Sequence, residues 1–310
     1  KEPKQQKGKG WRKKDKFLDA GQFGDVVAKK LKRETDRNLI SELAIKGSHE
    51  NMKKYLGNLN LADMECFVTD NERHNCPVCN RNRKFYCADC LEGSMFPEKV
   101  PKVDLPIRLT IIHHESEKLK KSSAVPLKIY NRELINVVHW PKDALEDELN
   151  AEGTYILYPH KDALTVKEFK PEDLNSIKKV VALDCTWFQT NALVGVVSKF
   201  PVKYVKLEEY ETTFWRPQHH SKRCLSTCEA IYYFFKEYDV AKNRLTNESY
   251  EYDGKYDNLL FYYILQFKSI ERAWAKGGQH YVEKDEEGDD KVQQEEEKKV
   301  PEQQINDFSY

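Results

Sequence analysis

Short apolar runs that end in polar or aromatic residues recur through the middle of the chain and predict the strands of a sheet. A run of four to eight apolar residues with polar flanks is typical of a buried strand, although a buried helix segment gives the same pattern. The predicted strands cover residues 107–112, 135–140, 154–159, 180–183 and 202–207.

Helical spacing of apolar residues alternates with these runs. Ser226 with Glu229 three residues later forms a capping-box pattern, which marks the start of a helix. Because helices alternate with strands, the pattern predicts one α/β domain over residues 104–275. The predicted helices cover residues 173–178, 191–197, 225–238 and 256–274.

Charge is distributed unevenly outside this domain. The 310 residues include 51 Lys and Arg against 51 Asp and Glu, so the net charge of zero hides a basic arm over residues 1–35 and an acidic tail over residues 277–310. Both stretches are polar enough to be predicted disordered. Residues 36–70 are predicted to form a short helical segment. The basic arm is a candidate for a nucleic-acid contact or a nuclear address, and a solvated tail is the alternative.

The chain lacks the apolar runs that membrane insertion or secretion requires. No run approaches the length of a transmembrane helix, so we expect no membrane partner. The basic beginning has no apolar segment after it, so no signal peptide is expected. The eight cysteines are therefore expected in a reducing compartment, where close pairs indicate a metal site rather than disulfides.

Two CxxC pairs, Cys76 with Cys79 and Cys87 with Cys90, are separated by seven residues. Each pair offers two thiolates from one turn, and two such turns complete a tetrahedral four-sulfur site for Zn²⁺. The sequence therefore predicts a compact structural zinc knuckle over residues 74–97, with four unligated cysteines as the alternative.

Polar patches follow the predicted strands at 113–123, 158–159, 184–189 and 216–229. Open parallel sheets bind ligands at the carboxyl ends of their strands, so these patches are the candidate site. Asp184 stands at the end of the 180–183 run. The alternative interpretation is that Asp184 only caps the next helix.

Several residues in these patches suit a nucleotide-like ligand. The helix start at Ser226 offers backbone N–H groups to an anion such as a carboxylate. Trp187 and Tyr158 could stack on a base. The cationic side chains that could hold phosphates are Arg216, Lys222 and Arg223.

Taken together, these patches resemble the motifs of the DTW-domain family. Asp184 to Trp187 resembles its signature of an acidic residue, any residue, Thr and Trp. His114 to Glu117, followed by 121–124, is similar to its His-Pro-x-Glu and Ser-Thr-Ala motifs, but Glu115 replaces the Pro and Ser123 the usual Thr. The resemblance covers residues 75–275, and the chain is most similar to eukaryotic members of the family. Further matching segments are Leu157-Tyr158-Pro159, Leu225 to Ala230, the two CxxC pairs and 255–261.

The resemblance implies a SPOUT-like α/β fold with a trefoil-knotted sheet flanked by helices. It implies a tRNA-uridine aminocarboxypropyltransferase, which moves the 3-amino-3-carboxypropyl group of S-adenosylmethionine to N3 of a D-loop uridine in tRNA and releases methylthioadenosine. A nuclear location, with a cytoplasmic pool as the alternative, fits such an enzyme. A SPOUT-like RNA methyltransferase and a non-catalytic, zinc-bearing RNA-binding adaptor are the rival functions.

The resemblance also suggests roles for individual residues. Asp184 is the predicted base, with Thr186 holding it or the uracil carbonyl and Trp187 packing on the cofactor or the base. The predicted S-adenosylmethionine contacts are Leu157, Tyr158, Pro159, Leu225, Ser226, Thr227, Glu229 and Ala230, and the predicted RNA contacts are His114, Ser123, Arg216, Lys222 and Arg223.

Overall fold

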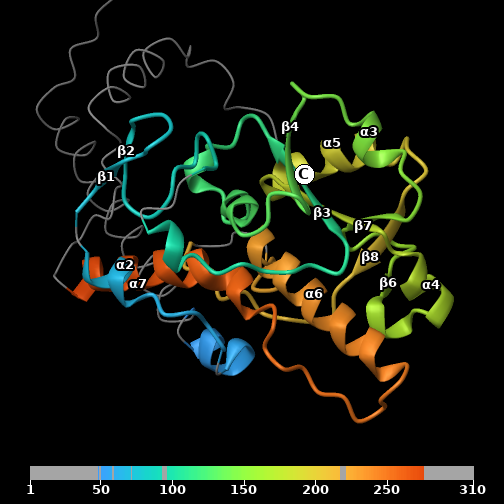
Figure 1. The fold of residues 1–310 in the computed structure, drawn as a ribbon. Helices are drawn as coiled ribbons and strands as arrows, with labels where there is room; N and C mark the ends of the chain where they lie inside the picture. The colour runs from blue at the N-terminus through green and yellow to red at the C-terminus, as the bar shows by residue number, and fades with distance from the viewer. Residues whose placement is uncertain are drawn as a thin grey trace, which may run out of the picture. The chain divides into compact units, whose positions relative to one another are not determined.

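The computed structural model describes residues 48, 50–57, 59–70, 72–92, 96–216 and 221–275 (Figure 1). The predicted basic arm, the first part of the 36–70 segment and the acidic tail lie outside the described residues. The chain divides into two compact units, one formed by 1–58 with 210–225 and the other by 59–209 with 226–310. Within the described residues, no helix is both long and apolar enough to cross a membrane.

The second unit is built on a six-stranded sheet in which all pairings are parallel, with the order β4-β3-β7-β5-β8-β6. Every predicted strand is present, and the two-residue strand β6 is an addition that is too short to produce a pattern. The strands are β3 (Arg108–His114), β4 (Ile135–Trp140), β5 (Thr154–Leu157), β6 (Leu164–Thr165), β7 (Lys179–Asp184) and β8 (Lys203–Lys206).

The strand order shows that two strands are inserted between earlier ones. β7 lies between β3 and β5, and β8 lies between β5 and β6. Gly153, just before β5, accepts hydrogen bonds from the amides of Lys178 and Lys179 with its carbonyl and so joins the starts of β5 and β7. Its φ of 77° and the closeness of the Ser176 carbonyl leave no room for a side chain there.

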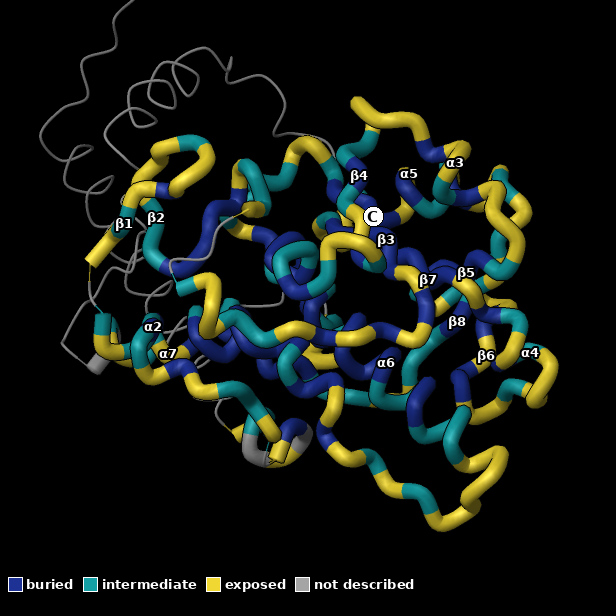
Figure 2. The backbone as a smooth tube through the Cα atoms, viewed as in Figure 1, coloured by how far each residue is buried: buried dark blue, intermediate teal, exposed yellow. Residues whose placement is uncertain are grey.

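Helices cover both faces of the sheet, and strand alternation decides which side chains each face receives. On one face, Leu149 of α3 (Glu146–Leu149) and Leu193 of α5 (Trp187–Val197) pack with Ile112 and Val181. On the other face, α6 (Thr227–Arg244) contacts β5 and β7. β3 and β7 are therefore buried along most of their length (Figure 2).

Helix α6, the longest among the described residues, is buried on nearly all sides along its first half, where Phe234 and Phe235 are fully covered. It contacts η6 (Asp257–Leu260), which leads directly into α7 (Phe261–Ala275). The other helical elements are η1 (Met52–Leu56), α2 (Glu65–Thr69), η2 (Pro97–Lys99), η3 (Leu119–Lys121), η4 (Val125–Ile129), η5 (Val166–Glu168) and α4 (Pro171–Ser176).

A small hairpin precedes the sheet in sequence. β1 (His74–Asn75) and β2 (Asn82–Arg83) pair antiparallel and flank the first CxxC pair. Ion pairs from Arg81 and Arg83 to Asp89 tie this hairpin to the turn of the second CxxC pair. The four cysteines are thus presented from two adjacent turns, as their spacing predicts.

Candidate active site

The register of β3 and β7 brings two polar residues together at the carboxyl edge of the sheet. His113 lies opposite Asp184 in the parallel pairing. Val180, Ala182 and Asp184 share one face of β7 because side chains alternate along a strand, and Val181 packs on the α3 and α5 side. Asp184 therefore points to the α6 side of the sheet.

Asp184 is held in place by two side chains. Its Oδ2 atom lies 2.7 Å from His113 Nδ1, and Ser122 Oγ donates to the same Oδ2 at 2.7 Å. The Asp184 residue is 7% exposed and His113 only 1%. The carboxylate is therefore nearly enclosed, with its orientation determined by β3 and the loop before η4.

The environment of His113 favours its charged form. Burial lowers the pKa of His113, but the hydrogen bond and the charge of Asp184 outweigh burial, so the net shift of this pKa is upward. His113 Nε2 lies 2.9 Å from the backbone carbonyl of Glu117. A carbonyl only accepts hydrogen bonds, so Nε2 carries a proton.

The loop containing Ser122 and Ser123 links Asp184 to the start of α6. Ser122 Oγ accepts the amides of Ala124 and Val125 at 3.1 and 3.0 Å while it donates to Asp184. Ser123 Oγ accepts the amide of Cys228, in the first turn of α6, at 3.2 Å. The predicted RNA contact Ser123 thus supports the α6 terminus, and the first turn of α6 lies beside the carboxylate.

Asp184 does not cap the helix that follows it. Thr186 is the N-cap of α5, and its amide and hydroxyl both donate to Gln189 Oε1 at 2.8 Å in a capping box. Helix α5 begins at Trp187, earlier than the predicted start at 191, and Trp187 is 37% exposed. Trp187 is therefore open to a ligand, and the hydrogen bonds that hold Asp184 come from His113 and Ser122 rather than from Thr186.

His113 and Ser122 are the site residues that sequence analysis missed. The family motifs align with their neighbours His114 and Ser123, although Ser123 stands where the family usually has Thr. His114 instead turns toward the other face, where its ring meets Trp140 edge-on at 5.1 Å. The alternation of Leu109 and Ile111 already indicated that His113 shares their buried face.

Most of the predicted S-adenosylmethionine contacts lie at two places, the carboxyl end of β5 and the first turn of α6. Tyr158 and Pro159 follow β5, which pairs with β7 through Leu157 and Ala182 and so ends next to Asp184. At α6, Ser226 accepts the Glu229 amide, and the buried Glu229 carboxylate accepts the Ser226 amide at 2.7 Å. Much of the polarity of this helix start is therefore already satisfied within the protein. Thr227 and Ala230 belong to the same first turn.

The remaining predicted contacts fall in the other compact unit. Leu225 and the three cationic residues Arg216, Lys222 and Arg223 belong to the unit that contains 210–225. Within that unit, the guanidinium of Arg216 lies 5.4 Å from the centre of the Phe214 ring, and the Thr212 amide donates a hydrogen bond to the Lys222 carbonyl at 2.7 Å. Their role in binding stays a prediction.

The four knuckle cysteines form a group that could hold a metal ion. All four Sγ atoms lie within 4.8 Å of one another, and neighbouring pairs are 3.2 to 3.5 Å apart. Four sulfurs at about 2.3 Å from a tetrahedral Zn²⁺ are about 3.8 Å apart, which lies between the shortest of these separations and the 4.8 Å limit, so the group could hold this ion. Burial raises the pKa of Cys76, but the backbone amides of Cys79 and Val78 and the neighbouring thiols outweigh it and lower this pKa to about 7, whereas burial and the neighbouring thiols raise the pKa of Cys90 to about 12.

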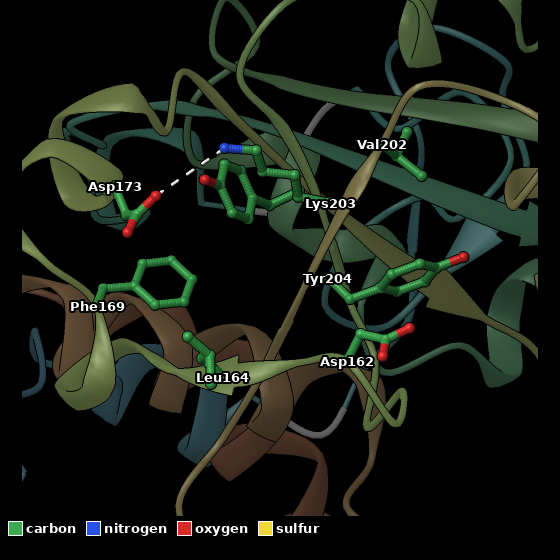
Figure 3. A pocket seen from close by; sticks show the side chains of 8 residues that line it. Asp162, Leu164, Phe169, Asp173, Val202, Lys203 and Tyr204 are labelled. Atoms are coloured by element: carbon green, nitrogen blue, oxygen red, sulfur yellow. Dashed lines mark ion pairs between the residues drawn. The ribbon is translucent and has the colours of Figure 1, made fainter.

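A separate hollow of about 370 Å³ lies near the starts of β5 and β8 (Figure 3). Its walls include Tyr155 and Lys203 from the strands, together with Phe169 and Asp173. Lys203 Nζ reaches Asp173 at 4.0 Å across it. Asp184 is not among its residues, so this hollow is distinct from the candidate site.

Fold and site together define an α/β protein with a buried, hydrogen-bonded carboxylate at the carboxyl edge of a parallel sheet. The family model of the DTW domain matches residues 84–271. The chain therefore belongs to the DTW-domain family, as its motifs predict.

The chain is similar to tRNA-uridine aminocarboxypropyltransferase 1 of Homo sapiens, with 30% identity over 268 residues that cover 72% of this chain and 86% of that protein. It is 29% identical over 247 residues to the protein of the same name from Xenopus laevis, covering 66% of this chain and 83% of that protein. A solved structure, the SAM-dependent rRNA:acp-transferase Tsr3 from Vulcanisaeta distributa, matches with 20% identity and a TM-score of 0.32, covering 53% of this chain and 84% of that one.

Proposed function

We propose that this chain is a tRNA-uridine aminocarboxypropyltransferase that moves the 3-amino-3-carboxypropyl group of S-adenosylmethionine to N3 of a D-loop uridine in tRNA. One observation carries the proposal: in a chain of the DTW-domain family, the acidic residue of the signature is a buried, oriented carboxylate at the carboxyl edge of the sheet. The names of its relatives support tRNA uridine as the acceptor.

The reaction needs one proton removed and one carbon oriented. The sulfonium is already a good leaving group, so the enzyme must mainly place the γ-carbon of the substrate near N3. As the bond between N3 and this carbon forms, the carbon–sulfur bond breaks and its electron pair stays on sulfur, giving methylthioadenosine. Asp184 takes the N3 proton as the general base.

The surroundings of Asp184 suit this task. Both hydrogen bonds from the protein end on Oδ2, so among the described residues Oδ1 is the oxygen left for the uridine proton. Trp187, three residues on and 37% exposed, offers a ring face for the uracil or the adenine. Tyr158 and Pro159 after β5 and the first turn of α6 border the same edge and would hold S-adenosylmethionine.

Basic residues outside the site would hold the tRNA backbone. Arg216, Lys222 and Arg223 are proposed for this role, with His114 beside the sheet edge. Phosphate contacts make binding salt-dependent, so their replacement would weaken tRNA binding and flatten its salt dependence. We also propose a nuclear location, for which the basic arm over residues 1–35 would be the targeting signal.

Two structural elements complete the proposal. Zn²⁺ would bind Cys76, Cys79, Cys87 and Cys90 and stabilise the hairpin and the adjoining turn. We also propose a SPOUT-like sheet with a trefoil knot, which the family resemblance implies; the insertion of β7 and β8 between earlier strands agrees with such a sheet but is also common in unknotted ones.

The test is product analysis with purified protein, S-adenosylmethionine and tRNA. We expect methylthioadenosine and a modified uridine from the wild type, and neither from Asp184→Asn while tRNA binding is retained. Adenosylhomocysteine as the product would indicate methyl transfer instead. Binding of tRNA without any S-adenosylmethionine binding would indicate an RNA-binding adaptor.

A further inference from the structure

The hydrogen bonds around His113 determine where its protons lie. Nε2 faces the Glu117 carbonyl at 2.9 Å and must therefore donate. The Ser122 hydroxyl accepts two backbone amides, so its single proton points to Asp184 Oδ2. Oδ2 is then an acceptor, and His113 Nδ1, 2.7 Å away, donates to it as well.

We propose that His113 is a positioning residue, an imidazolium whose charge faces the Asp184 carboxylate and whose hydrogen bond holds Oδ2 so that Oδ1 faces the uridine. This inference rests on the proposed function of Asp184 as the base. His113 is only 1% exposed, so it acts through Asp184 and does not touch the substrate. A carboxylate that is 7% exposed needs such a partner, because a buried charge without a hydrogen-bonded, oppositely charged partner is costly.

The other titratable groups around this pair do not replace the charge of His113. Glu117, in the loop after β3, adds negative charge that favours the imidazolium. His139 on β4 meets the His113 ring edge-on at 5.7 Å, and burial together with the charge of His113 lowers its pKa, so it is the neutral member of the two. The thiols of Cys185 and Cys228 have raised pKa values because of burial, so they stay uncharged.

The variant His113→Asn separates charge from packing. Asparagine keeps a polar donor but removes the positive charge that faces the buried Asp184 carboxylate. The acid limb of the pH profile of kcat/KM for methylthioadenosine release should move to higher pH by about one unit or more. A loss of packing alone would lower kcat/KM equally at all pH values and leave the limb in place, which would overturn the proposal.

The matched control is His139→Asn, which alters the neighbouring histidine that does not contact Asp184. Its acid limb should stay at the wild-type position. An independent measurement on the wild type removes any dependence on variant folding: nitrogen NMR of the histidine rings should find His113 mostly doubly protonated at pH 7. A neutral His113 ring at pH 7 would overturn the proposal, whereas a wild type that releases no methylthioadenosine would instead contradict the proposed function.

Discussion

Glu148 of α3 joins three neighbouring strands, and its replacement should destabilise the sheet that carries the site. Its carboxylate accepts hydrogen bonds from Thr110 of β3 at 2.6 Å, Asn136 of β4 at 2.7 Å and Lys179 of β7 at 2.7 Å. Burial raises the pKa of Glu148, but the hydrogen bonds from Lys179, Thr110 and Asn136 outweigh burial, so this pKa is lowered overall.

The cost of Glu148→Gln follows from these contacts. Hydrogen bonds to a charged group contribute about 1.5–3 kcal/mol each, and an amide retains part of them. The Lys179 side chain is only 11% exposed, so the loss of its partner adds a desolvation cost. We expect the free energy of unfolding to fall by about 2–4 kcal/mol, which corresponds to roughly 4–16 °C in melting temperature for a unit of this size.

A double-mutant cycle that combines Glu148→Gln with Lys179→Met isolates the interaction between these two side chains. Urea unfolding of the wild type, both single variants and the double variant should give a coupling energy of about 1–3 kcal/mol. The lowered pKa gives the pH dependence: the contribution is fully present above the unfolded pKa of about 4.3 and is lost as the pH falls through the folded value. A coupling energy near zero, or a deficit of Glu148→Gln that persists undiminished at pH 3, would refute this reasoning.

Three further changes test other parts of the structure. Thr186→Ala removes the N-cap of α5 and should cost about 1 kcal/mol in urea unfolding, whereas Thr186→Ser should cost little; equal costs would argue against the cap. Cys87→Ser should lower the zinc content from one ion per chain, measured by elemental analysis, and destabilise the protein; Cys66→Ser is the matched control, and an unchanged zinc content in Cys87→Ser would exclude the four-cysteine site. Trp187→Ala should raise KM for tRNA or S-adenosylmethionine several-fold through lost stacking, and an unchanged KM for both would remove it from the site.

Short-range sequence patterns predict the strands and the grouping of the four cysteines. Contacts between segments that are distant in sequence determine the partners of Asp184. The five predicted strands and the cysteine spacing are short-range features, and the structure contains them. The partners of Asp184 are not: His113 is 71 residues away in sequence and Ser122 is 62 away. The family motif aligns with His114. A sequence match cannot determine which of two adjacent histidines faces the core, so it does not identify His113. Strand β6 has two residues and forms only by pairing with β8.

The central chemical role in this DTW-domain chain is the one proposed for Asp184, removal of the uridine N3 proton. The most direct test is mass spectrometry of the small-molecule product and of the tRNA nucleosides after incubation of wild type and Asp184→Asn with S-adenosylmethionine and unmodified tRNA. We expect equal amounts of methylthioadenosine and 3-(3-amino-3-carboxypropyl)uridine from the wild type, and at least a hundredfold less of both from the variant. Wild-type turnover by Asp184→Asn would contradict the account.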